Sequence, residues 1–372
     1  MNAEEAFAEA VGIAQQVQLP VPQPELVAPR SPARRAEWWE RVRADRVRAN
    51  ATGVEVRQRL APLLSALPGD HGGEPLPAGR HRVNQSWHSL QVPVDAQWPT
   101  DGLAGAVIAP IDPEVPLPAF VRDRISLAEC TPDEPRGTLI NVHGGAWWTG
   151  DGAVRATLGV PQAISLAEFT GWRVLDLDVR LVPEHPYPLP VFDVLAAIDW
   201  VRQRHDGPVV LAGTSSGAHT VAVAALLAAH DHQRPIDGQL LIVPSLDLAT
   251  LGPEHRRSEE ARAARWAQLQ AVFGLPEPEL VRELVGVSPL ANPVLIEPGF
   301  ARALPPTMIA VGEYDETVVG GELYAALLAG SGVRIDCHEY VRGHTLITPG
   351  ESRRMYTDID NWLQTITGTT QG

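Results

Sequence analysis

One serine in the chain lies in a setting that favours nucleophilic chemistry. Residues 213–217 read Gly-Thr-Ser-Ser-Gly, with Ser215 at the centre. The apolar run "PVVLAG" leads into this pentapeptide and "GAHTVAVAALLAAH" follows it, which predicts a strand before the serine and a helix after it. A nucleophile elbow requires that order, because small flanking residues permit the sharp turn that exposes the hydroxyl. A nucleotide-binding turn would need a G-x-G-x-x-G spacing, which is absent here.

A serine hydroxyl needs a base to accept its proton, and the base needs a carboxylate to orient it. Asp315 directly follows the apolar run "PTMIAVG" and its loop, and His344 lies in "VRGHTL", just past the last strand-like segment. Both positions fall where loops leave the carboxyl edge of a sheet. We therefore predict a catalytic triad of Ser215, Asp315 and His344, in that chain order.

Neighbouring acids and histidines are interpreted as structural or surface groups. Glu313 and Glu316 are rival carboxylates that fit a surface position better than a catalytic one. His338 is a rival base, but it lies within the predicted last strand and is less free to reach a site. The remaining histidines considered are His185, His219, His230 and His232. Because no third ligand accompanies the His-Asp-His run at 230–232, we predict no metal site.

The run "HGGAWW", residues 143–148, follows the short β-rich segment "TLINV". Acyl transfer needs backbone N–H donors directed at the oxyanion of the tetrahedral intermediate. We predict that Gly145 and Ala146 supply two donors, that Gly144 shapes the loop, and that Ser216 supplies the third N–H. A left-handed conformation at Ala146 would cost about 1 kcal/mol or more.

Two adjacent tryptophans, Trp147 and Trp148, complete this loop. Their indole rings are large enough either to pack the loop or to line an acyl pocket. The sequence leaves both interpretations open, and we assign both residues to substrate binding.

Strand-like and helix-like segments alternate from Gly137 onward, which predicts a mostly parallel sheet flanked by helices, an α/β architecture. Residues 1–85 are helical by pattern, and Pro62 should kink a third apolar segment or begin it. We predict that residues 1–85 form an N-terminal helical cap. Residues 86–372 form the catalytic domain, with a cap insertion at about 249–300.

Composition excludes several classes of protein. The chain has 372 residues, 44% hydrophobic and 20% charged, with a net charge of −15, which disfavours a nucleic-acid binder. All 30 basic residues are arginine, so pyridoxal enzymes and Walker-type nucleotidases are excluded. Cys130 and Cys337 are the only cysteines, so no disulfide framework is expected. The N-terminus does not resemble a signal peptide and no run spans a membrane, which predicts a cytoplasmic protein.

These motifs resemble the hormone-sensitive-lipase-like (GDXG) branch of the α/β-hydrolase superfamily. "HGGAWW" is similar to that branch's His-Gly-Gly-Gly-aromatic loop, and "VRLVPEHPYPLPVFD" (179–193) is similar to its Tyr-Arg-Leu-Ala-Pro-Glu-His-Pro-Phe-Pro segment. The resemblance covers roughly residues 135–366. It implies an α/β-hydrolase fold, a Ser–His–Asp triad, no cofactor, and hydrolysis of esters of small or medium acyl groups.

The chain departs from that pattern at three positions near the expected site. Thr214 stands where relatives usually have Asp, Ser216 where they have Ala, and Ala146 where they have the third Gly. Amide or formamide hydrolysis, a tailoring reaction such as elimination, cyclisation or acyl transfer, and non-catalytic ligand binding remain as alternatives. The expected partner is a small-molecule acyl substrate, and a homodimer is left open.

Overall fold

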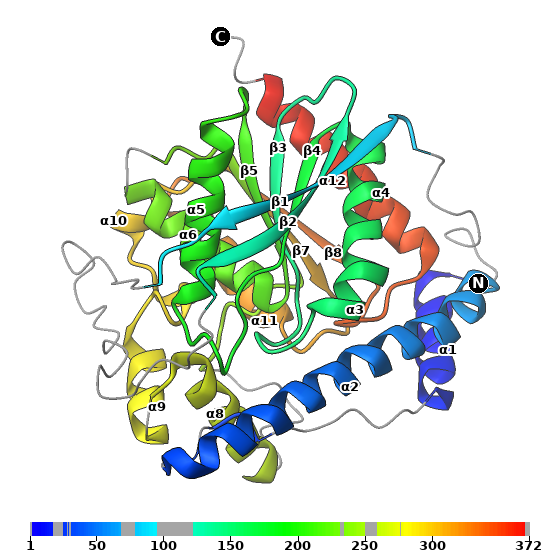
Figure 1. Ribbon diagram of the computed structural model, residues 1–372. Helices are drawn as coiled ribbons and strands as arrows, with labels where there is room; N and C mark the ends of the chain where they lie inside the picture. The colour runs from blue at the N-terminus through cyan, green and yellow to red at the C-terminus, as the bar shows by residue number, and fades with distance from the viewer. Residues whose placement is uncertain are drawn as a thin grey trace.

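A sheet of eight strands forms the centre of the computed structural model, which describes residues 2–17, 25–27, 29, 31–67, 79–94, 122–230, 234–249, 259–275 and 277–368 (Figure 1). The strands are β1 (Val83–Gln91), β2 (Arg124–Pro132), β3 (Thr138–Val142), β4 (Arg173–Leu177), β5 (Val209–Thr214), β6 (Gly238–Ile242), β7 (Thr307–Gly312) and β8 (Ile335–Tyr340). Their order is β1-β2-β4-β3-β5-β6-β7-β8. Strand β2 is antiparallel to both its neighbours and every other pair is parallel, which confirms the predicted α/β sheet.

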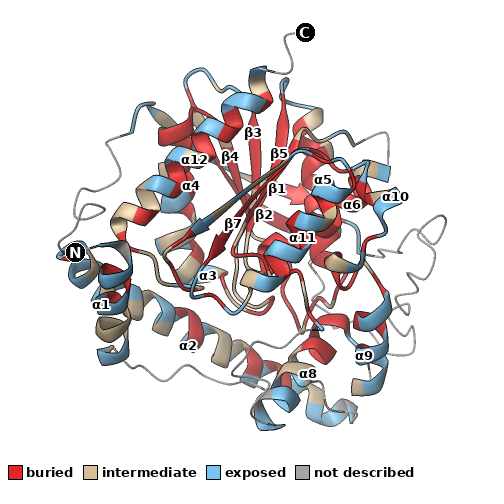
Figure 2. Ribbon diagram, turned by 180° about the vertical axis from the view of Figure 1, so that it is seen from behind, coloured by how far each residue is buried: buried red, intermediate tan, exposed pale blue. Residues whose placement is uncertain are grey.

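Helices cover both faces of this sheet, because successive strand residues point to opposite sides. In β3, Leu139 packs into the cluster formed with α4 and α12, whereas Ile140 packs into the cluster formed with α5, α6 and α11. Figure 2 shows the strands as the buried centre, with exposed residues on the outer faces of the helices. These flanking helices are α4 (Val160–Thr170), α5 (Leu189–Arg202), α6 (Ser216–His230), α11 (Val318–Gly330) and α12 (Pro349–Gly368).

Four further helices lie beyond the edge of the sheet where the parallel strands end (Figure 1). They are α1 (Ala3–Gln16), α2 (Pro32–Ser65), α8 (Glu259–Phe273) and α9 (Pro278–Val287). Short helical turns occupy α3 (Gly152–Val154), η1 (Arg155–Gly159), η2 (Pro293–Leu295) and α10 (Pro298–Ala301). Helices α8 and α9 belong to the predicted insertion at 249–300, and Gly274 ends α8 with a left-handed φ of 65°.

The N-terminal segment differs from the expectation at Pro62. Helix α2 runs without a break through this residue, so Pro62 does not begin a third helix and that prediction is wrong. The proline lies in the last turn, where it removes one backbone donor shortly before the helix ends anyway. Strand β1 begins at Val83, so its first three residues fall within the range assigned to the cap.

Several predictions concern residues that the structure does not describe. They include most of the glycine-rich linker at 68–79, the middle of the strand region at 82–127, and positions 231 and 232 of the His-Asp-His run. Among the described helices, none combines the length and apolar character needed to cross a bilayer. The cytoplasmic location and a homodimer stay predictions.

Candidate active site

Ser215 lies at the sharp turn between β5 and α6. Its φ of 57° is left-handed, a conformation that costs an L-residue energy and recurs at functional turns. The turn is tight because α6 begins against β3: a Cβ at Gly217 would overlap the carbonyl oxygens of Val142 and His143. The N–H of Ser215 donates to the carbonyl of Ile242 at 2.9 Å, which fixes the turn against β6.

The three residues predicted as a triad form a hydrogen-bonded chain. Ser215 Oγ lies 2.7 Å from His344 Nε2, and His344 Nδ1 lies 2.9 Å and 3.0 Å from the two carboxylate oxygens of Asp315. The Asp315 side chain is fully buried, whereas 31% of the His344 side chain is exposed. The imidazole is therefore anchored on one side and open toward the nucleophile on the other.

Asp315 is held in its ionised form. Burial alone would raise the pKa of this carboxyl group, but the hydrogen bond and charge of His344, together with the N–H of Thr317 at 2.9 Å, outweigh that effect and hold its pKa below the usual value. An ionised carboxylate facing Nδ1 favours the tautomer that carries its proton there, leaving Nε2 free to accept the proton of Ser215.

The rival groups do not join this chain. Glu313 and Glu316 are exposed, as expected for surface residues. His338 lies within β8 and contacts Asp336 at 2.7 Å, on the strand itself.

The loop at 143–148 has a left-handed backbone over three consecutive residues. The φ angles are 130° at Gly145, 52° at Ala146 and 65° at Trp147. The left-handed angle at Ala146 was considered from the sequence, whereas the one at Trp147 was not predicted. Among the described residues, none accepts a hydrogen bond from the N–H groups of Gly145, Ala146 or Ser216. Three backbone donors close to Ser215 thus have no acceptor within the described part of the chain.

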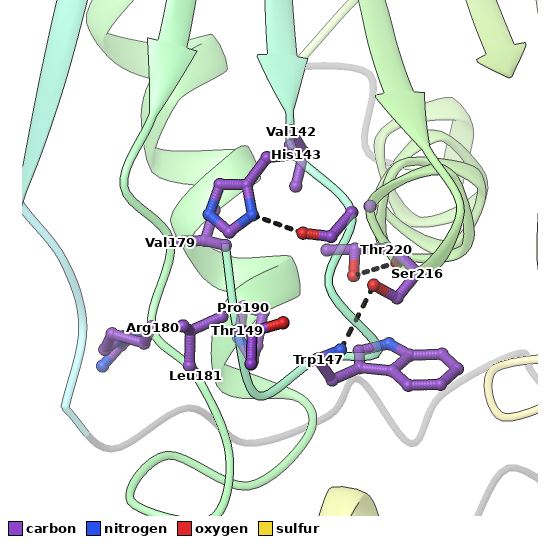
Figure 3. A pocket seen from close by; sticks show the side chains of 12 residues that line it. Val142, His143, Trp147, Thr149, Val179, Arg180, Leu181, Pro190, Ser216 and Thr220 are labelled. Carbon is purple, nitrogen blue, oxygen red and sulfur yellow. Dashed lines mark hydrogen bonds between the residues drawn. The ribbon is translucent and has the colours of Figure 1, made fainter. Parts of the chain in front are cut away.

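Both loop tryptophans are buried. Trp147 is 5% exposed and meets the ring of His219 edge-on at a centroid distance of 5.4 Å. The guanidinium of Arg265 on α8 lies 5.9 Å from the centroid of Trp147. Trp148 is 9% exposed. A small cavity beside the loop is lined by Trp147, Thr149, Leu181, Thr220 and eight further residues, and Ser215 is not among them (Figure 3).

Residues 179–193, the segment that resembles the family motif, pack against this loop and support it. Arg180 and Asp193 form a fully buried ion pair at 2.7 Å. His185 Nε2 accepts the N–H of Arg122 at 3.1 Å, and burial lowers the pKa of His185 to about 3, so this ring stays neutral. These groups position the backbone and do not face the nucleophile.

Helix α2 carries two residues that contact this loop and that sequence reasoning missed. Arg46 donates to the carbonyl of Trp148 at 2.6 Å and to a carboxylate oxygen of Glu184 at 2.8 Å. Asn50 donates to the Asp151 side chain at 2.6 Å and accepts the N–H of Gly150 at 3.1 Å. Helix α2 therefore holds the C-terminal end of the loop that contains the three left-handed residues.

Helix α1 packs against the residues that directly precede Asp315 and His344 in the chain. The ring of Phe7 stacks on Tyr314, with centroids 4.6 Å apart, immediately before Asp315. A Cβ at Gly343, the residue before His344, would lie 3.5 Å from the Phe7 ring. The two N-terminal helices thus pack against the loops of all the candidate catalytic residues except Ser215.

We expect Arg46→Met to lower the free energy of unfolding by about 3–5 kcal/mol, because it leaves the buried Glu184 carboxylate unpaired. Urea denaturation measures this change. Arg41→Met is the matched control, since Arg41 lies on the same helix in an exposed pair with Glu37 and should change stability by about 1 kcal/mol at most. Adding Glu184→Gln to Arg46→Met should restore part of the loss. Equal unfolding midpoints for the two arginine variants would contradict the proposed anchor.

Comparison with known proteins places this arrangement in a family. Residues 139–345 match the model of a protein family whose description is "alpha/beta hydrolase fold". This range includes Ser215, Asp315 and His344. The chain belongs to this α/β-hydrolase family. The match confirms the resemblance predicted from the sequence motifs.

Named relatives of this α/β hydrolase are esterases or related hydrolases. The chain is 29% identical over 250 residues to carboxylesterase NlhH of Mycobacterium tuberculosis, covering 64% of this chain and 70% of that one. It is 31% identical over 272 residues to an acetyl-hydrolase of Streptomyces hygroscopicus, covering 66% and 83%. A hyperthermophilic esterase from the archaeon Pyrobaculum calidifontis superposes with a TM-score of 0.63 at 21% identity, over 98% of both chains. This last similarity concerns the fold.

Proposed function

We propose that this α/β hydrolase is a carboxylesterase that cleaves esters of small or medium acyl groups through an acyl-enzyme. The observation that carries the proposal is the continuous hydrogen-bonded chain from Ser215 through His344 to the buried carboxylate of Asp315. A protein that only bound a ligand would have no need of this alignment. The esterase activities named for its relatives agree with the proposal.

In the proposed reaction, Ser215 Oγ attacks the ester carbonyl carbon while His344 Nε2 takes the hydroxyl proton. His344 then donates that proton to the leaving alkoxide, which departs as an alcohol. Water attacks the acyl-enzyme with the same base, and the acid product leaves with Ser215 restored. Asp315 keeps the imidazole oriented and stabilises its charged form throughout.

The tetrahedral intermediate carries a negative oxygen that needs donors already in place. We assign this role to the unpaired N–H groups of Gly145, Ala146 and Ser216, with Gly144 shaping the loop. A Cβ at Gly144 would lie 3.1 Å from Ser215 Cβ, a tight contact that a glycine avoids where the loop approaches the nucleophile.

We further propose that residues 1–85 and the insertion at 249–300 form the cap that shapes the acyl pocket. Gln268 on α8 donates to the carbonyl of Ala146 at 3.2 Å, so the insertion contacts the oxyanion loop directly. The ring of Trp147 faces Arg265 of α8 and is the better candidate for a pocket wall. Trp148 is fixed through its carbonyl to α2 and is assigned to packing the loop.

Covalent labelling combined with a substrate panel tests this function. A fluorophosphonate should modify one serine, located by peptide mass spectrometry at Ser215. p-Nitrophenyl acetate, butyrate and octanoate should be hydrolysed, whereas the p-nitroanilides of the same acids should react far more slowly. Faster cleavage of the anilides would favour the amidase alternative. If the protein is not labelled and cleaves none of these esters, the proposed esterase activity is overturned.

A further inference from the structure

The side chain of Ser216 connects the two parts of the candidate oxyanion site. Its Oγ accepts the N–H of Trp147 at 3.2 Å (Figure 3). The residue is 3% exposed and begins α6 directly after the nucleophile. Its own N–H is one of the three unpaired donors, and its hydroxyl contacts the loop that supplies the other two.

The loop needs external support because its backbone is strained. Ala146 and Trp147 both adopt left-handed φ angles of 52° and 65°, which L-residues reach only at an energetic cost that glycine lacks. For a bulky aromatic residue such as Trp147 this conformation is a clear outlier. Strained conformations persist only where surrounding contacts determine them.

A complete account of the loop's backbone groups shows what holds it. The carbonyl of Gly145 accepts the N–H groups of Trp148 and Thr149 and the hydroxyl of Thr149. The carbonyls of residues 146–148 accept hydrogen bonds from Gln268 Nε2, the Val182 N–H and Arg46 Nε, in that order. Of the N–H groups at 145–147, only that of Trp147 has a partner among the described residues, and the partner is Ser216 Oγ. This hydrogen bond holds the N–H side of the peptide between Ala146 and Trp147, and Gln268 holds its carbonyl side.

We propose that Ser216 is a positioning residue, whose hydroxyl holds Trp147 and so keeps the N–H groups of Gly145 and Ala146 directed at the oxyanion. The inference rests on the esterase function proposed above. Because these donors act on the charge that develops in the transition state, loosening them should lower kcat and leave KM nearly unchanged.

A double-mutant cycle tests the proposal with p-nitrophenyl butyrate. Ser216→Ala should lower kcat about three- to tenfold, the loss typical of one hydrogen bond, with KM within about twofold of the wild type. In combination with Ala146→Gly, the same change should cost less than about twofold, because glycine adopts the left-handed conformation without strain. Ser216→Thr keeps the acceptor and should retain most of the activity.

Thr220→Val is the matched control on the same helix, since it removes a buried hydroxyl that bonds to the carbonyl of Ser216 and not to the loop. It should leave kcat unchanged. Hydrogen exchange gives a readout independent of activity: the Trp147 amide should exchange faster in Ser216→Ala, while thermal melting stays close to that of the wild type.

Two results would overturn the role of Ser216. One is an equal loss of kcat from Ser216→Ala with and without Ala146→Gly; the other is an unchanged exchange rate at Trp147. If Ser216→Ala does not fold, two measurements still test the proposal. Ser216→Thr should retain most of the activity, and the Trp147 amide of the wild-type protein should be protected from exchange. A wild-type protein that neither cleaves the ester nor reacts with a fluorophosphonate would instead overturn the proposed function.

Discussion

Ser215→Ala is expected to lower kcat for ester hydrolysis by about 10⁴- to 10⁶-fold, the loss seen when a serine nucleophile is removed. The change removes the hydroxyl oxygen that lies 2.7 Å from His344 Nε2. Alanine can occupy the same left-handed turn at no greater strain than serine, since both carry a Cβ, so the fold should persist. Steady-state kinetics on p-nitrophenyl butyrate and urea denaturation measure the two effects.

Ser288→Ala is the matched control for this experiment. Ser288 is buried, and its hydroxyl has no partner among the described residues, so its loss should change neither kcat nor stability appreciably. Fluorophosphonate labelling should disappear in Ser215→Ala and persist in Ser288→Ala. Activity within tenfold of the wild type, or labelling transferred to Ser216, would contradict the assignment of Ser215 as nucleophile.

The residues around Ser215 could be placed from the sequence because their signals are local. A strand, a serine between small residues and a helix fit within residues 208–230, and loops after parallel strands meet at one edge of the sheet. Asp315 and His344 each follow such a strand, which is why two residues far from Ser215 in the chain could be expected beside it. The structure places all three in contact.

The conformation of Trp147 could not be predicted, because its residue type disfavours a left-handed φ. Tertiary contacts account for it: the Trp147 N–H donates to the Ser216 hydroxyl at 3.2 Å, and the Trp147 carbonyl accepts the N–H of Val182 at 3.0 Å. From the sequence, Ser216 and Ala146 were separate departures from the family pattern. In the structure both adjoin Trp147. Ser216 does so through the hydrogen bond of its hydroxyl, and Ala146 is the preceding residue in the chain.

The role of α2 was missed for a different physical reason. Its many arginines alternate with acids, a pattern typical of a solvated helix face. Arg41 fits that interpretation, with an exposed partner four residues away. Arg46 does not, since it pairs with Glu184 in a buried contact. Nothing in the local sequence distinguishes the two arginines, because the partner of Arg46 is distant in the chain.

Gly145→Ala is expected to lower kcat by about 100- to 1000-fold, the typical loss of one oxyanion donor. Gly145 has a φ of 130°, and a Cβ there would overlap the carbonyl oxygen of Thr149. The peptide must therefore rotate, which redirects the N–H groups of both Gly145 and Ala146. KM should change little, because the carbonyl oxygen of the bound ester carries little charge before the reaction.

Gly152→Ala separates this effect from the general cost of placing alanine in a left-handed position. Gly152 lies at the exit of the same loop with a φ of 54°, but a Cβ there would meet nothing within 4 Å. This variant should lose some stability and keep its kcat, whereas Gly145→Ala should lose kcat far more than stability. Thermal melts and kinetics on p-nitrophenyl butyrate make the comparison. Native melting with full kcat in Gly145→Ala would mean that the loop only packs, and the donors for the oxyanion would then have to lie elsewhere at the carboxyl edge of the sheet.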